Sequence, residues 1–157
     1  MDIELKRKIG GFLGFQKSRL GVISTISTEN KPESAFVYYT FDENLNIYFA
    51  TRELSRKYKN ILKNKNVAFA MATENPPQTL QLEGIAEAYH DTKEQKELFQ
   101  ELIVLASAKH FSPPISQQSH FGALQFVRIT PSWIRFGNFE VRKHEGIFQE
   151  VELSDNK

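Results

Sequence analysis

One short turn of the chain brings together hydroxyl and cationic side chains that could hold an anion. Thr51 and Ser55 supply hydroxyl groups, and Arg52, Arg56 and Lys57 supply cations. Ser55 is of the residue type that caps a helix N-terminus, where the first N–H groups of the helix stay free. Free N–H groups, the positive end of a helix dipole, a guanidinium and an ammonium are together the chemistry of a phosphate site.

The same spacing has a simpler interpretation, in which the cations only solvate a helix. Basic residues on a short amphipathic helix usually form its water-facing side, and Lys59, Lys63 and Lys65 fit that interpretation. No glycine-rich loop accompanies the turn. Spacing alone therefore leaves both the phosphate site and the solvated face open.

Two strands and a short helix must position this turn. Asn46–Ala50 alternates as a strand does, and Val67–Met71 has strand composition again. Between them, apolar residues at i, i+4, i+7 and i+8 predict a helix of about two and a half turns. This stripe consists of Leu54, Tyr58, Ile61 and Leu62.

The rest of the chain is mostly predicted strand. Leu20–Ser27 and Ser34–Phe41 precede the strand from Asn46 with short turns between them, a meander that indicates a barrel or sandwich. Gly84 indicates a bulge or the close approach of another backbone. Later strands are expected over Thr79–Tyr89, Ala123–Ile129, Ser132–Phe136 and Phe148–Leu153, with a break at Thr130-Pro131.

Two more helices are expected around this barrel. The first covers about residues 2–15, and its apolar stripe should close one end of the barrel: Leu5, Ile9, Phe12 and Leu13. The second begins at Asp91 or Thr92 and carries Leu98, Phe99, Leu102 and Ile103. A proline-containing loop over 109–119 is either a plain connector or a flap near a ligand.

Length and composition indicate one mainly β domain over 1–157, with a barrel of six to eight antiparallel strands over about 20–153. A net charge of +1 gives no reason to expect nucleic acid or an anionic membrane as a partner. Cysteine is absent and the four histidines are scattered, so no metal site is expected. The sequence shows no apolar run of about eighteen residues and no signal-peptide pattern, so we expect a cytoplasmic protein.

The segment Phe49–Lys57, followed by Asn60–Asn64 and a strand, resembles the phosphate-binding segment of the pyridoxamine-phosphate-oxidase-like FMN-binding split-barrel family. The resemblance extends upstream over Gly21–Thr51 and downstream over Leu80–Ala86, with a looser similarity at Ile129–Ile134. It implies an antiparallel split β-barrel that binds FMN.

On this resemblance, Arg56 and Lys57 occupy the positions that hold the FMN phosphate, with Thr51 and Ser55 as hydroxyl partners. The strand beside the flavin ring contains Val37, Tyr38 and Tyr39. Neighbouring residues of a strand point to opposite faces, so at most one of the two tyrosines can face the ring.

The resemblance also marks Thr79 and Trp133. Thr79 is a cofactor-binding candidate that aligns with the first of two positions, a glutamine and an arginine, preceding the Glu-Gly pair in the oxidases proper. Trp133 falls where the family often brings an aromatic from the partner chain, although it could equally be a core tryptophan.

The departures from the oxidases proper concern the substrate rather than the cofactor. Ala35 and Thr40 stand where those enzymes have an arginine and a lysine, and Gln81 aligns with the arginine before Glu-Gly. Val141–His144 does not reproduce their Arg-Leu-His-like motif. The resemblance therefore implies a retained cofactor site and a lost vitamin-substrate site.

Three functions stay open, and no catalytic residue is assigned. The first is an FMN-dependent oxidoreductase that acts on a small molecule with NAD(P)H as donor. The second is a flavin- or haem-binding module without turnover, for which His110 or His120 could ligate haem iron. The third is a structural barrel whose basic turn is only surface. A deazaflavin is an alternative to FMN.

A homodimer with the cofactor at its interface is also expected. The barrel is too small to enclose a three-ring cofactor, and exposed strand edges favour pairing with a second copy. Aromatic residues of the late segments could supply the interface: Phe121, Phe126, Trp133 and Phe136.

Overall fold

The computed structural model describes residues 1–15, 19–90, 93, 97, 100, 101, 124–140 and 146–153. Two helices and seven strands have their bounds within these residues, and Lys93, Glu97, Gln100 and Glu101 are also helical. In chain order the two helices and seven strands are α1 Ile3–Phe15, β1 Leu20–Ile26, β2 Pro32–Phe41, β3 Ile47–Arg52, α2 Arg56–Lys63, β4 Asn66–Glu74, β5 Pro77–Tyr89, β6 Leu124–Asn138 and β7 Phe148–Glu152. None of the helices in these ranges is long and apolar enough to cross a membrane.

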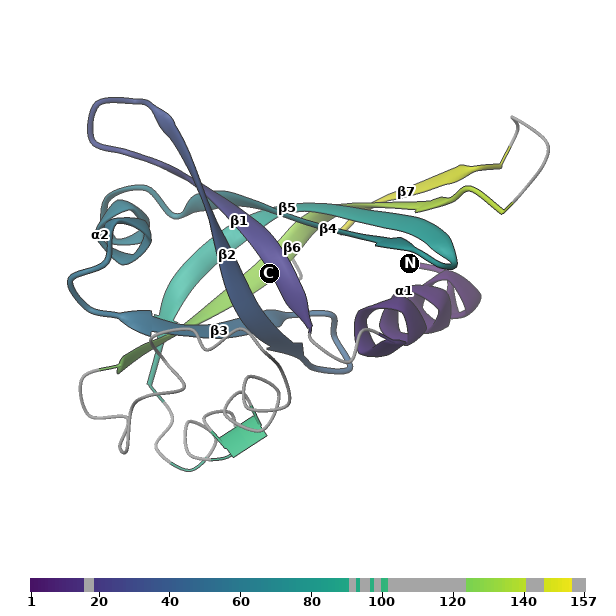
Figure 1. Cartoon of the computed structure of the whole chain (residues 1–157), viewed down its shortest axis with the longest axis horizontal. Coiled ribbons are helices and arrows are strands. Elements are labelled where there is room, and N and C mark those ends of the chain that lie inside the picture. Colours follow the sequence, from purple (N-terminus) through teal and green to yellow (C-terminus); the bar gives the residue numbers. More distant parts are fainter. Residues whose placement is uncertain are drawn as a thin grey trace.

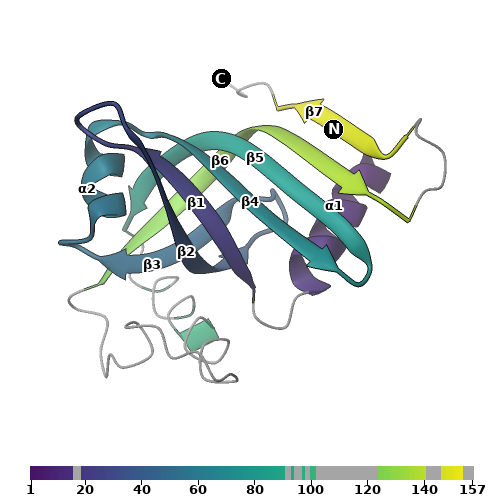
Figure 2. The same ribbon diagram turned by 45° about the horizontal axis from the view of Figure 1, so that its top comes forward.

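The strands form one antiparallel sheet in the order β3-β2-β1-β4-β5-β6-β7, and an additional β3–β6 pairing closes the first six strands into a barrel. β7 pairs only with β6 and extends the sheet beyond the barrel (Figure 1). Figure 2 shows α1 and α2 at opposite ends of this barrel. The expected mainly β fold and split β-barrel are confirmed, as is the opening meander β1-β2-β3.

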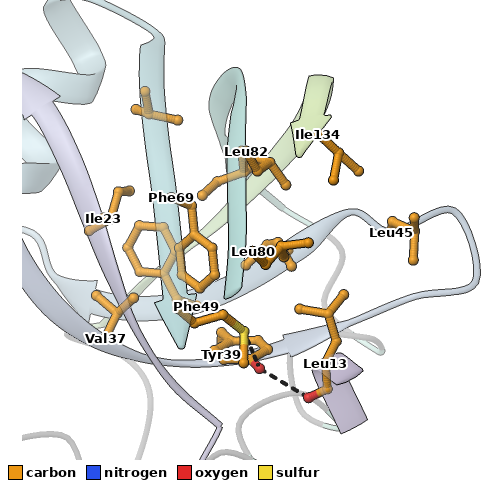
Figure 3. Packing of buried hydrophobic residues seen from close by; sticks show 14 of the residues in the cluster. Leu13, Ile23, Val37, Tyr39, Leu45, Phe49, Phe69, Leu80, Leu82 and Ile134 are labelled. Atoms are coloured by element: carbon orange, nitrogen blue, oxygen red, sulfur yellow. Dashed lines mark hydrogen bonds between the residues drawn. The ribbon is translucent and has the colours of Figure 1, made fainter. Parts of the chain in front are cut away.

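Strand alternation explains the core. Every second residue of β1, β3 and β4 is buried, and these inward side chains meet at the barrel axis, where Ile23, Phe49 and Phe69 lie close together (Figure 3). The hydroxyl of fully buried Tyr39 donates to the backbone oxygen of Leu13, at 3.0 Å. This bond ties α1 to the barrel wall, and the predicted closure of one end by α1 is confirmed.

The predicted break at Thr130-Pro131 is wrong, because β6 continues through it as one strand. Glu83 pairs with Trp133 and Gly84 pairs with Pro131, so β6 accommodates its extra residue as a bulge, a position that tolerates proline. A Cβ atom on Gly84 would lie 2.3 Å from the Thr130 oxygen. The close backbone approach predicted at Gly84 is therefore confirmed.

The predicted apolar stripe of α2 is only half correct. Tyr58 and Ile61 are buried, but Leu54 and Leu62 are 79% and 60% exposed. Leu54 precedes the helix, which begins at Arg56, and the short helix presents only a narrow face to the sheet. Four predicted features lie outside the described residues: the apolar stripe of residues 98, 99, 102 and 103, the 109–119 loop with His110 and His120, the interface candidate Phe121, and the Val141–His144 segment.

Candidate functional site

Ser55 begins α2 as predicted. Its backbone is extended (φ −67°, ψ 147°), and its Oγ accepts the N–H of Tyr58 at 3.3 Å, the geometry of an N-cap. The Lys59 N–H bonds to the Ser55 oxygen at 3.1 Å and closes the first helical turn. The N–H groups of Arg56 and Lys57 therefore have no partner within the helix, and they carry the positive end of its dipole.

Hydroxyl and ammonium groups converge at this helix start. The Thr51 Oγ1 lies 2.9 Å from the Ser55 Oγ, and the Lys57 Nζ donates to Thr51 Oγ1 at 3.4 Å. Burial lowers the pKa of the Lys57 ammonium below its usual value, because its charged form is partly withdrawn from water. An anion placed here would meet a positive charge that solvent screens less than an exposed lysine.

A cavity of about 250 Å³ opens beside this group. Its walls come from β2, β3, the turn before α2, the first turn of α2 and the start of β6: Phe36, Val37, Tyr38, Ala50, Thr51, Arg52, Ser55, Lys57 and Leu124. We call this cavity the α2 pocket. It combines a polar end, made by the helix start, with an aromatic and aliphatic wall from β2, which is the chemistry that a phosphorylated flat ring requires.

Five of the nine predicted site residues line the α2 pocket, namely Val37, Tyr38, Thr51, Ser55 and Lys57. Tyr38 packs outside the main core, with Leu20 and Ala50, whereas Tyr39 is fully buried inside it. Strand alternation thus decides which of the two tyrosines can reach a ligand. Tyr39 instead supports the barrel.

Thr79 and Trp133 do not line the α2 pocket. Thr79 pairs with Gly137 across β5 and β6, and its Oγ1 is the nearest atom to a Cβ built on that glycine, at 2.7 Å. Trp133 is half-buried on β6 between Glu83 and Glu152. Within the single chain, both residues therefore contribute to the pairing of neighbouring strands and not to the α2 pocket.

Arg56 also departs from the predicted arrangement. Its side chain is 80% exposed and forms an ion pair with Glu33 of β2 instead of lining the α2 pocket. Asn60 donates from Nδ2 to the other Glu33 oxygen, at 3.0 Å. The Arg56 guanidinium and the Asn60 amide hold the pKa of Glu33 below its ordinary value. In this structure Arg56 therefore fastens α2 to the sheet.

Three residues of the pocket were not among the predicted candidates, namely Phe36, Ala50 and Leu124, and Arg52 was named only as one of the cations of the turn. A sequence signal existed for Phe36, since residues two apart on a strand share a face and Tyr38 was already a candidate. Leu124 had none, because only the pairing of β6 with β3 brings it to Arg52. Among the described residues, no group of three or more potential metal ligands occurs.

Similar structures share the fold. General stress protein 26 from Bacillus anthracis str. Sterne has a TM-score of 0.69 at 22% identity, covering 96% of this chain and all of that one. A haem-binding protein from Mycobacterium smegmatis has a TM-score of 0.64 at 15% identity, covering 87% of this chain and 53% of its own. PhzG from Burkholderia lata 383, solved in complex with tetrahydrophenazine-1-carboxylic acid, has a TM-score of 0.64 at 14% identity, covering 96% and 90%.

Among proteins with curated descriptions, none matches this sequence. A family model described as pyridoxamine 5'-phosphate oxidase matches residues 9–138, which include every strand of the barrel and all of α2. The matched range thus contains the whole lining of the α2 pocket. The chain belongs to the pyridoxamine 5'-phosphate oxidase family.

Proposed function

We propose that the chain binds FMN in the α2 pocket and is an FMN-dependent oxidoreductase that acts on a small molecule. The observation that carries this proposal is the convergence of Thr51, Ser55 and Lys57 on the start of α2, at one end of a pocket with an aromatic wall. Two hydroxyls, one partly buried ammonium and two free N–H groups match the oxygens of a phosphate monoester.

Each residue group has a separate part in this proposal. Lys57 and the N–H groups of the first turn neutralise the phosphate, while Ser55 and Thr51 fix the position of the ammonium. Phe36 and Tyr38 provide flat surface along which a ring can pack. Bound FMN would supply the hydride and electron chemistry, which no side chain of the pocket provides.

The proposed oxidoreductase is a homodimer with the cofactor at the interface. A cavity of about 250 Å³ falls below the usual range for small-ligand sites, about 300–1,000 Å³. On the rim of the pocket, the side chain of Phe36 is 70% exposed. The strand pairing places Val22 of β1 next to it and Ala68 and Ala70 of β4 beyond Val22, so the apolar surface extends from Phe36 across these two strands. A second copy on this face would complete the pocket and cover Phe36, in an interface of about 2,000 Å² or more.

The proposed substrate is less anionic than a pyridoxal phosphate. The basic side chains of the oxidases proper are missing at Ala35 and at Thr40, which is buried and accepts a hydrogen bond from Arg19 at 3.1 Å. We propose NADH or NADPH as donor and a quinone-like or nitroaromatic acceptor, with no oxidation of pyridoxamine phosphate.

A binding module without turnover is the second candidate. The similarity to a haem-binding protein from Mycobacterium smegmatis supports haem as an alternative ligand, and a deazaflavin would use the same phosphate-binding groups. The α2 pocket favours a flavin, since its polar end suits a phosphate and, within the part of the chain that the structure describes, its lining contains no histidine, methionine or cysteine.

The visible spectrum and mass of the copurifying ligand test the cofactor. We expect a yellow protein with FMN at about one per chain, as one pocket per chain implies. Anaerobic mixing with NADH and NADPH then tests turnover, because an oxidoreductase of this kind must accept electrons from a donor. A bound flavin that stays oxidised for many minutes with both nicotinamides would favour the binding module, and tight haem binding that excludes FMN would overturn the flavin assignment.

A further inference from the structure

A second and larger cavity lies on the other side of α2. It measures about 600 Å³ and separates the helix from the turn between β1 and β2. We call it the basic cleft. Figure 1 shows this turn and α2 at the same end of the barrel. The cleft is lined by Ser27, Thr28, Glu29, Lys31, Glu33, Arg56, Lys59, Asn60, Leu62 and Lys63.

The helix contributes a row of cations to this cleft. Arg56, Lys59 and Lys63 stand at i, i+3 and i+7, which places them along one face of α2. The interpretation of Lys59 and Lys63 as part of a plain solvated face is therefore incomplete, because both line a concave surface. Lys65 lies beyond the helix and outside the cleft, where it pairs with Glu87 at 2.7 Å.

The charges within the cleft are only partly balanced. Arg56 pairs with Glu33, and Lys31 pairs with Glu29 at 2.6 Å. Over the part of the chain that the structure describes, Lys59 and Lys63 form no ion pair and have no carboxylate partner in the cleft. Two positive charges are left in a concave surface whose walls exclude part of the solvent, and such a surface concentrates a positive potential.

Hydrogen bonds hold both walls of the cleft in place. Asn60 is buried, and its Nδ2 donates to Thr25 Oγ1 at 3.0 Å as well as to Glu33. On the opposite wall, the Ser27 Oγ accepts the N–H groups of Glu29 and Lys31, at 3.3 and 3.2 Å. A ligand would therefore meet a preformed site and would not have to order it on binding.

We propose that the basic cleft binds a small organic anion with at least two negative charges, carried as phosphate or carboxylate groups, independently of the α2 pocket. Side chains one helical turn apart on one face are neighbours, so the Lys59 and Lys63 ammonium groups can share one polyanion. The exposed side chain of Leu62 offers apolar surface for the carbon part of the ligand. A volume of about 600 Å³ is the size of a small-molecule site.

Titration calorimetry of the full chain, saturated with FMN, tests this with pyrophosphate and citrate as probes. FMN keeps the probes out of the α2 pocket. We expect at least one probe to bind, with an affinity that falls as salt is raised. Stronger binding of pyrophosphate identifies a phosphate ligand, and stronger binding of citrate a polycarboxylate.

Variants locate the binding. Lys59→Gln combined with Lys63→Gln should weaken the probe by roughly fivefold to thirtyfold, since contacts to two solvent-exposed ammonium groups are lost and each contributes less than a buried one. Lys63→Glu alone should also weaken it, whereas Lys65→Gln should leave it within about twofold, because Lys65 does not line the cleft.

Failure of both probes to bind the wild type at millimolar concentration would overturn the proposal. So would an equal loss in Lys65→Gln, which would indicate only a general effect of net charge. A chain that binds neither flavin nor haem would be titrated directly, with Lys57→Gln as the control that separates the two cavities. Loss of FMN binding therefore refutes the proposed function without refuting the basic cleft.

Discussion

Replacing Lys57 and Arg56 separately tests the different roles that the structure gives to these two adjacent cations. Lys57 lines the α2 pocket and reaches Thr51 Oγ1, whereas Arg56 faces Glu33 on the other side. A charge-assisted hydrogen bond to a phosphate is worth about 1.5–3 kcal/mol. Lys57→Ala should therefore weaken FMN by about tenfold to 150-fold.

Arg56→Ala should weaken FMN by less than about threefold, because an exposed ion pair contributes little and the guanidinium is already engaged by Glu33. The assay is quenching of flavin fluorescence during titration, with riboflavin as the matched ligand that lacks the phosphate. Both variants should bind riboflavin within about twofold of the wild type, since the lost contact is to the phosphate alone.

Two results would refute this reasoning. Equal losses of FMN and riboflavin in Lys57→Ala would mean that the ammonium does not contact the phosphate. A loss in Arg56→Ala as large as that in Lys57→Ala would mean that Arg56 leaves Glu33 when the ligand binds. The original prediction of two phosphate-binding cations would then stand.

Three further outcomes follow from the same structure. A bound phosphate opposes the burial that lowers the pKa of Lys57, so FMN binding at alkaline pH should take up a proton in the wild type and not in Lys57→Gln, measured by calorimetry in buffers of different ionisation enthalpy. Arg56 lowers the pKa of Glu33, so the stability that Glu33 provides is present at neutral pH and is lost as the pH falls through its folded-state pKa. In urea unfolding, the free energy of unfolding of Glu33→Gln should therefore fall less steeply in acid than that of the wild type. Gly84→Ala places a Cβ against a carbonyl of the opposite strand and should destabilise the chain by about 1–3 kcal/mol or more, whereas Gly10→Ala, with no atom within 4 Å of the added Cβ, should gain about 0.5–1 kcal/mol.

Local sequence patterns were sufficient where a feature depends on neighbours in the chain. Ser55 was recognisable as an N-cap because capping needs only a short polar side chain before a helix. The strands β1 to β5 follow from alternation and turn residues, and the buried face of α1 follows from its periodicity. The resemblance at Phe49–Lys57 then gave the family, which the match over residues 9–138 confirms.

Contacts between distant segments decided what sequence patterns could not. Proline at 131 appeared to end a strand, but pairing with β5 accommodates it in a bulge opposite Gly84. Arg56 and Lys57 are neighbouring cations at the start of the same helix, so the sequence pattern assigned both of them to the phosphate. Only the packing of α2 against β2 turns Arg56 towards Glu33.

The sequence by itself thus determined the strands β1 to β5, the helix start and the polar groups that it carries, because each depends on residues close together in the chain. The tertiary structure alone decided which cation serves the α2 pocket, which tyrosine lines it, and that Lys59 and Lys63 border a cleft. These outcomes depend on the register of β2, β3 and β6 and on the side of α2 that faces the sheet. Strand register and helix rotation are set by the packing of the whole core. They cannot be predicted from any single segment of the chain.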